Sequence, residues 1–241
     1  AFLFSYLDPS HELRAREILT EELGDISVSL SHQVAREWRE YERTSSTVVD
    51  AYIAPVVRRY LERLETEMGR RGLGVPVHVM QSSGGIVTAQ SARDLSLQTI
   101  LSGPVGGTVG GVALARILNR PNLICVDMGG TSFDVSLVVD GKPDVASETT
   151  FEGFPLLMSV VNIHTIGAGG GSLAYSEAGG LRVGPQSAGA DPGPASYGRG
   201  GTRPTVTDAN LVLGRVDPAA FAGGRMTLDR EAAERAEAIL A

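Results

Sequence analysis

The chain has 241 residues, of which 42% are hydrophobic and 20% charged, an ordinary balance for a soluble globular chain that excludes disorder as the main state. Its 28 acidic and 21 basic side chains give a net charge of −7, and the sequence has no basic block, which argues against nucleic acid as the main partner. The sequence also lacks a run of about 18 apolar residues that would predict a membrane span.

The single cysteine and the single lysine narrow the possible classes of protein. Cys125 excludes an internal disulfide and is typical of a reducing compartment, so we expect a cytoplasmic protein. Lys142 is followed by Pro143 instead of Ser or Thr, which excludes a Walker-type phosphate loop. The chain begins at Ala1 within an apolar run, without a charged leader, which is typical of a segment from the middle of a longer polypeptide.

The first third of the chain predicts helices. We expect a helix over residues 10–23 ended by Gly24, an extended stretch over 25–34, and a longer helix over 46–71. Pro55 should kink or interrupt the first turns of that longer helix. Its apolar residues recur at spacings of 3 and 4, which favours packing on its own domain over a partner surface.

From Val75 the pattern changes to short strands and a glycine-rich helix. Residues 75–80 and 86–88 predict strands joined by a glycine turn. A helix over 102–118 follows, with Ser102 as its expected N-cap. The start of this helix is rich in glycine, which indicates either close packing or the close approach of a ligand; these glycines are Gly103, Gly106, Gly107, Gly110 and Gly111.

The second half of the chain is glycine-rich. Residues 123–126 form a continuous apolar run, which is typical of a strand buried on both faces. Residues 167–201 contain 12 Gly and 3 Pro among few charges, but their apolar side chains favour an ordered, loop-rich site over a disordered linker. We expect Thr207 to cap a short helix that ends at Leu213, and a last helix over 229–240.

The segment Asp127–Asp134 carries the strongest functional signal, because an acidic residue and a Gly-Gly-Thr turn directly follow the apolar strand. Gly129 and Gly130 allow positive φ, so that successive N–H groups and the Thr131 hydroxyl can surround an anion. Asp127 would repel a phosphate but can hold a divalent cation beside it.

The residues after this turn indicate a β-hairpin. Residues 135–139 are extended in character and lead into Asp140–Gly141, a tight-turn signal, whereas a Rossmann site or a P-loop would continue into a helix. A strand, a glycine turn and a second strand predict a phosphate-binding hairpin. A hairpin without a ligand is the alternative, but it does not explain an Asp at the end of an apolar strand.

A second glycine segment, residues 162–172, follows further along the chain. We expect its loop to line a nucleotide or substrate cleft, and a structural turn between strands is the alternative. The residues of this loop predicted to contact the cofactor are Gly167, Gly169, Gly170, Gly171 and Ser172. The loop matches the dinucleotide-binding pattern poorly, because residues 173–183 predict another hairpin instead of a helix.

The four histidines show no metal-ligand spacing. His164 lies beside the glycine loop, and Asp191 and Asp208 occur downstream in glycine-rich or helix-start settings. These three side chains could share a cation or activate water. With Asp127, they make up the predicted metal ligands.

Several long strings, in a fixed order, resemble the hydantoinase A/5-oxoprolinase family. They include LFSYLDPSHE, VMQSSGG, LSGPVGG, DMGGTSFDVS, NIHTIGAGGGS, SAGADPGPASYG and PTVTDANLVLGR, and they extend over residues 3–215. The resemblance implies an α/β fold of the ribonuclease-H-like type, similar to actin and sugar kinases, in which two domains close on ATP. It divides the chain into a helix-rich lead-in over 1–101 and a phosphate-hairpin domain over 102–241.

The resemblance also implies roles for particular residues. Asp127, Asp134 and His164 would be catalytic, and ATP with Mg²⁺ or Mn²⁺ would be the cofactor. His164 favours hydantoinase-type members, and Ser196 stands where many members carry Cys. The residues that would contact the nucleotide include the glycine loop already named and the turn residues Gly129, Gly130, Thr131 and Ser132.

The implied activity is the ATP-dependent opening of cyclic amides such as hydantoins or 5-oxoproline, together with a hydantoinase B-type subunit or domain. An acetone-carboxylase-type subunit and a non-catalytic nucleotide-binding scaffold are the alternatives. The first phosphate hairpin and the adenosine segment of the family do not occur in these residues. The segment alone is therefore expected to be inactive and to bind ATP no more tightly than about 1 mM.

Overall fold

The computed structural model describes residues 1–240, which form two units, each held by its own contacts. The first unit contains Ala1–Leu123 and Ser136–Asn162, and the second contains Ile124–Val135 and the chain from Ile163 onward. The boundary expected between residues 101 and 102 falls inside the first unit. The division into 1–101 and 102–241 stays a prediction, and residue 241 lies outside the described residues.

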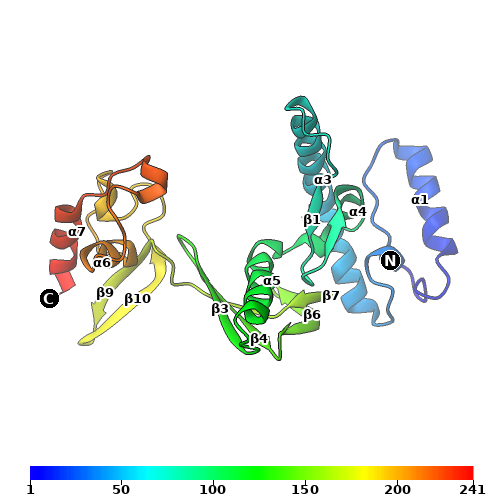
Figure 1. The fold of residues 1–241 in the computed structure, drawn as a ribbon. Helices are drawn as coiled ribbons and strands as arrows, with labels where there is room; N and C mark the ends of the chain where they lie inside the picture. Colours follow the sequence, from blue (N-terminus) through cyan, green and yellow to red (C-terminus); the bar gives the residue numbers. More distant parts are fainter. Residues whose placement is uncertain (241) are drawn as a thin grey trace. The chain divides into compact units, whose positions relative to one another are not determined.

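The first unit consists mainly of helices and two hairpins (Figure 1). The helices are α1 (Ser10–Leu23), α2 (Ser31–Val34), α3 (Glu40–Arg70), α4 (Ala89–Asp94), the 3₁₀ turn η1 (Ser96–Thr99) and α5 (Ser102–Ile117). The prediction of α1 and its end at Gly24 is confirmed. The expected extended stretch over 25–34 is wrong at its end, since its last four residues form α2.

Helix α3 begins at Glu40, earlier than the sequence predicts. Ser46 and Thr47 look like a helix start, but both donate their hydroxyls to carbonyls one turn earlier, those of Glu42 and Arg43, at 2.7 Å. These bonds let hydroxyl residues lie inside a helix. Pro55 does not interrupt α3, and because of the earlier start it lies in the middle of the helix.

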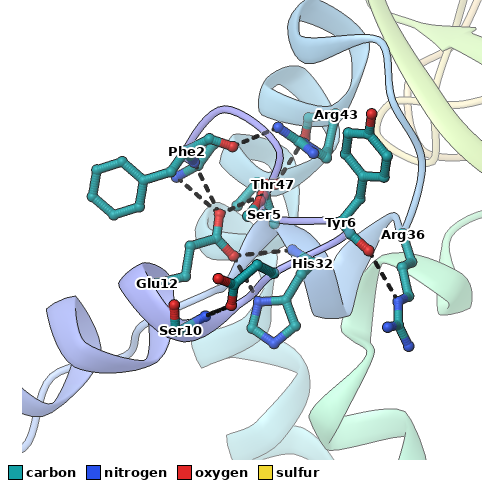
Figure 2. A network of polar contacts seen from close by, with 12 residues as sticks. Phe2, Ser5, Tyr6, Ser10, Glu12, His32, Arg36, Arg43 and Thr47 are labelled. Atoms are coloured by element: carbon teal, nitrogen blue, oxygen red, sulfur yellow. Dashed lines mark hydrogen bonds and ion pairs between the residues drawn. The ribbon is translucent and has the colours of Figure 1, made fainter.

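A buried carboxylate joins the start of the chain to α1 and α2 in the first unit (Figure 2). Glu12 is 2% exposed and accepts hydrogen bonds from the Ser31 hydroxyl at 2.5 Å, from His32 Nδ1 at 2.7 Å and from the Phe2 N–H at 3.0 Å. Arg43, also buried, donates to the Phe2 carbonyl at 2.6 Å. The network therefore ties Phe2 to α3 directly and to α2 through Glu12.

The first unit contains two antiparallel hairpins, and the second of them supplies most of its core. Strands β1 (His78–Met80) and β2 (Ile86–Thr88) pair antiparallel, as do β6 (Val145–Phe151) and β7 (Phe154–Val161). The core includes Leu97, Leu156, Met158 and Val160. The sequence interpretation did not predict β6 and β7, although Glu152 and Gly153 form the tight turn between them, both with positive φ.

The bounds of helix α5 agree with the prediction, but its N-cap residue differs from the predicted one. Leu101, with φ of 60°, is the N-cap and makes no side-chain cap bond, so Ser102 is the first helical residue. A Cβ built at Gly103, Gly106 or Gly107 meets no heavy atom within 4 Å in the part of the chain that the structure describes. The close packing expected at these glycines is therefore not seen there.

A four-stranded sheet contains β3 (Leu123–Met128), β4 (Phe133–Val139), β5 (Lys142–Pro143) and β8 (Ile163–Ile166). Their order is β3-β4-β5, and β8 also pairs with β4. The predicted strand–turn–strand hairpin and the Asp140–Gly141 turn are confirmed. The expected burial of β3 on both faces is wrong, because Ile124 is 71% and Val126 is 59% exposed, with neither side chain covered by the described residues.

The second unit continues with the predicted hairpin of β9 (Ser172–Glu177) and β10 (Gly180–Ser187) and with two helices, α6 (Val206–Val212) and α7 (Arg230–Glu237). Short 3₁₀ turns are η2 (Ala195–Tyr197), η3 (Phe221–Gly224) and η4 (Ala238–Leu240). Thr205, and not Thr207 as predicted, caps α6. Leu211, Leu228 and Ala233 form the core of the second unit.

Within residues 1–240, no helix is long and apolar enough to cross a membrane.

Candidate functional site

The turn between β3 and β4 lies in the second unit and is open to solvent. The Gly129 N–H donates to the Ser132 carbonyl at 2.9 Å, which closes the turn. Asp127, Gly129, Gly130 and Thr131 are all exposed. The positive φ expected of Gly129 and Gly130 is not found, and a Cβ at Gly130 meets no described heavy atom within 4 Å. The small residues therefore leave space beside the turn.

Asp134 is the second residue of β4, on the other side of the turn, and is half-buried. Its Oδ1 accepts a hydrogen bond from the Thr165 hydroxyl at 2.6 Å. Thr165 belongs to β8, which pairs with β4. The bond fixes the Asp134 carboxylate beside the turn.

The glycine loop between β8 and β9 packs directly on this turn. Gly170 donates to the Gly129 carbonyl at 2.9 Å, and Gly171 donates to the Gly130 carbonyl at 2.6 Å. A Cβ at Gly169 would lie 2.5 Å from the Thr131 nitrogen, closer than real Cβ contacts allow. The two glycine segments that the sequence singled out therefore form one structure, and residue 169 has to be glycine.

The far side of the loop is held by other parts of the second unit. Thr207 donates to the Gly170 carbonyl, and Ala188 donates to the Gly171 carbonyl. A Cβ at Gly184 would lie 2.3 Å from the Gly167 carbonyl oxygen, so this position also excludes a side chain. The Ser172 hydroxyl, predicted to contact the cofactor, is fully buried and has no hydrogen-bond partner among the described atoms.

Asp208, a predicted metal ligand, is fully buried, and its carboxylate accepts hydrogen bonds from other groups of the protein. The carboxylate accepts hydrogen bonds from the N–H groups of Ala195 at 3.2 Å, Ser196 at 2.8 Å and Thr205 at 3.1 Å, and from the Thr205 hydroxyl at 2.8 Å. It thus joins η2 to the start of α6. Burial first, and then the Asp208 charge, raise the pKa of Glu237 above its ordinary value.

The other predicted metal ligands are exposed. His164 is an exposed residue of β8, Asp127 is exposed at the end of β3, and Asp191 is exposed in the loop before η2. Across residues 1–240 no group of three or more His, Cys, Asp or Glu side chains is placed to hold a metal ion. A single exposed carboxylate at the turn, Asp127, still suits a cation that takes its other ligands from water and phosphate.

Comparisons with known proteins place these segments in a family. The family model described as hydantoinase/oxoprolinase matches residues 43–241, which include both glycine segments. The caprolactamase subunit alpha of Pseudomonas jessenii is 42% identical over 97% of this chain and 34% of its own length. The 5-oxoprolinase of Saccharomyces cerevisiae is 42% identical over 92% of this chain and 17% of its own length.

Solved structures agree with the sequence comparison. The ATP-dependent caprolactamase from Pseudomonas jessenii has a TM-score of 0.79 at 41% identity, over 98% of this chain and 34% of that one. A nucleotide-free acetone carboxylase, from a study of ATP-dependent acetone carboxylation, has a TM-score of 0.78 at 32% identity, over 97% of this chain and 34% of that one. The expected mixed α/β fold is confirmed. The chain spans about a third of the length of these two proteins.

Proposed function

The chain belongs to the hydantoinase/oxoprolinase family, and we propose that it supplies the phosphate-binding part of an ATP-dependent hydrolase that opens cyclic amides. The substrate class we propose is the hydantoin, N-methylhydantoin or 5-oxoproline type. The observation that carries this proposal is the exposed Gly129–Thr131 turn, backed by the Gly169–Gly171 backbone and flanked by Asp127.

The charges around the turn favour a nucleotide bound together with a cation. Residues 124–135 and 162–174 contain no Lys or Arg. The negative charge of a phosphate must therefore be met by backbone N–H groups and by a bound cation. Asp127 is the carboxylate placed to hold Mg²⁺ or Mn²⁺, with exposed His164 and Asp191 as further candidate ligands. Asp208 is left out of this set because its carboxylate already accepts four hydrogen bonds.

Each residue at the site has a proposed task. The N–H groups of Gly130 and Thr131, with the Thr131 hydroxyl, orient the phosphates, and the Ser132 hydroxyl adds a polar contact. The Gly129 N–H closes the turn by donating to the Ser132 carbonyl. Asp134, fixed by Thr165, keeps the end of β4 in place beside the reacting phosphate. A divalent cation, when bound, offsets the charge that develops on the phosphate oxygens.

The reaction that fits this site begins with transfer of the terminal phosphoryl group of ATP to the amide oxygen. Water then adds to the ring carbon and the ring C–N bond breaks, which leaves an acyl phosphate and a free amine. A second water attacks the acyl carbon, and phosphate leaves with the former amide oxygen. The products are the ring-opened acid, ADP and phosphate. His164, exposed on β8, is our candidate for the base that takes the proton from the first water.

We further propose that the activity needs a second polypeptide or domain of the hydantoinase B type. One relative is named as the alpha subunit of a caprolactamase, which implies at least one other subunit in that enzyme. The cytoplasmic location expected from the single cysteine stays a prediction.

The test is an activity screen of the protein together with its partner polypeptide against hydantoin, N-methylhydantoin, 5-oxoproline and caprolactam. Phosphate release and ring-opened product are measured in the same reaction. We expect one phosphate per ring opened and no ring opening without ATP. Ring opening that does not depend on ATP would contradict the proposal.

The carboxylase alternative rests on the structural similarity to acetone carboxylase. It predicts phosphate release that requires a ketone together with bicarbonate, so both are included in the screen. A non-catalytic scaffold predicts nucleotide binding without turnover under every condition of the screen.

A further inference from the structure

We propose that Thr207 is a positioning residue that holds the phosphate turn in place through Gly170. The inference rests on the proposed function, because the turn matters for activity if it binds the phosphates of ATP. Thr207 lies in the first helical turn of α6. It acts on the Gly129–Thr131 turn through one intervening residue, Gly170.

Two consecutive contacts connect Thr207 to the turn. The Thr207 N–H and its hydroxyl both donate to the Gly170 carbonyl oxygen, each at 2.8 Å. The Gly170 N–H in turn donates to the Gly129 carbonyl at 2.9 Å. Gly170 is thus bonded both to α6 and to the turn.

The space beside the Gly170 Cα is occupied by both of its bonding partners. A Cβ at Gly170 would lie 2.9 Å from the Thr207 hydroxyl oxygen and 3.7 Å from the Gly129 carbonyl oxygen. The two bonding partners therefore approach the same side of the Gly170 Cα. A shift of Gly170 away from Thr207 would change its distance to Gly129 as well.

The Thr207 hydroxyl is not needed to start α6. Thr205 and Asp208 already form a complete capping box, in which the Thr205 side chain and the Asp208 side chain each accept a backbone N–H. A helix start with these bonds is satisfied without a further hydroxyl. The Thr207 side chain therefore serves the glycine loop, and its removal leaves the cap intact.

Replacing Thr207 with Val removes the hydroxyl and keeps both the shape and the backbone N–H. One neutral hydrogen bond of this kind corresponds to a roughly three- to tenfold change in an equilibrium constant. We therefore expect Thr207→Val to raise the KM for ATP by about that factor. Thr207→Ser retains the hydroxyl and should restore the KM to near the wild-type value.

The experiment uses the complete protein with its partner polypeptide and measures KM for ATP, kcat and the thermal unfolding midpoint. The matched control is Thr66→Val, because the exposed Thr66 hydroxyl donates to a helix carbonyl, that of Glu62, in the first unit. Thr66→Val should leave KM unchanged. A folded Thr207→Val protein with the wild-type KM, or a Thr207→Ser protein as weak as Thr207→Val, would overturn the inference.

Amide hydrogen exchange separates this inference from the proposed function. In Thr207→Val without nucleotide, exchange should become faster in residues 169–171, with residues 145–161 unchanged. If the wild type hydrolyses no ATP, the proposed function fails and exchange alone decides: faster exchange in 169–171 supports the positioning role, and unchanged exchange refutes it.

Discussion

At the scale of single residues, Asp127 carries the electrostatic part of the proposed site. It is the exposed carboxylate next to the turn, in a segment without basic side chains. If it holds the cation beside the phosphates, Asp127→Asn should keep the fold and lower ATP turnover at least ~10²-fold, the order seen when a preorganised electrostatic group is lost. Steady-state phosphate release measures this effect.

The matched control for Asp127 is Asp140→Asn. Asp140 is exposed and lies in the β4–β5 turn with φ of 50°, a conformation that Asn also tolerates. Asp140→Asn should turn over ATP at the wild-type rate. Equal rates for both variants would remove Asp127 from the site.

A second residue-scale prediction compares two glycines of the same site. Gly169→Ala places a Cβ 2.5 Å from the Thr131 nitrogen, whereas Gly130→Ala points into open space. Overpacking of this kind costs about 1–3 kcal/mol. Gly169→Ala should therefore lower the thermal unfolding midpoint, and Gly130→Ala should leave it unchanged in the absence of ligand. Both variants can be followed by circular dichroism, and equal midpoints would show that the loop does not need a glycine at 169.

Particular residues also show how far the sequence could predict the site. The functional importance of the 127–134 and 167–172 segments was predicted from their composition and spacing. Their contact was not, because Gly170 bonds to Gly129 across 41 positions of the chain and no local pattern encodes that pairing. Thr207 was noticed as a helix start, but its bond to Gly170 depends on the same tertiary contact.

At the scale of elements, the bounds of helices with clear local signals were easier to predict than the burial of a strand. The bounds of α1 and α5 follow from local periodicity and end signals. Strand β3 shows the limit of such reasoning: its continuous apolar run predicts burial, yet burial depends on which segments cover the strand, and residues 1–240 leave Ile124 and Val126 exposed. Apolar sequence indicates a preference for burial, and neighbouring segments decide the outcome.

The Glu12 network makes an element-scale prediction about acid stability. Burial raises the pKa of Glu12, but the hydrogen bonds from Ser31, His32 and Phe2 outweigh burial and bring this pKa from 4.5 to about 2. Because the folded-state pKa is the lower one, the stabilisation is fully present above about pH 4.5 and is lost as the pH falls toward 2. The free energy of unfolding should therefore decrease over this range.

Glu12→Gln removes this titration. We expect a lower stability at pH 7 and a flatter dependence of the unfolding free energy between pH 4.5 and 2, measured by urea denaturation. Glu17→Gln on the exposed face of α1 is the control and should keep the wild-type pH dependence. A Glu12→Gln protein with the same pH dependence as the wild type would show that the network does not depend on the charge of Glu12.

At the scale of the whole molecule, the family and the mixed α/β fold were predicted from ordered sequence strings and were then confirmed. The division of the chain between residues 101 and 102 stays a prediction, and the contacts group residues 124–135 with the chain from residue 163 onward. The division into units depends on contacts between distant segments, and composition changes along the chain do not report them. The substrate, the metal and the partner of the whole protein remain proposals.

We propose that ATP phosphates bind at the Gly129–Thr131 turn and the glycine loop behind it. Hydrogen–deuterium exchange of the complete protein, with and without Mg-ADP, tests this location most directly. We predict slower exchange in residues 127–134 and 166–172 when the nucleotide is bound, and unchanged exchange in the β6–β7 hairpin, residues 145–161. Nucleotide binding that protects other segments and leaves 127–134 unprotected would contradict the account.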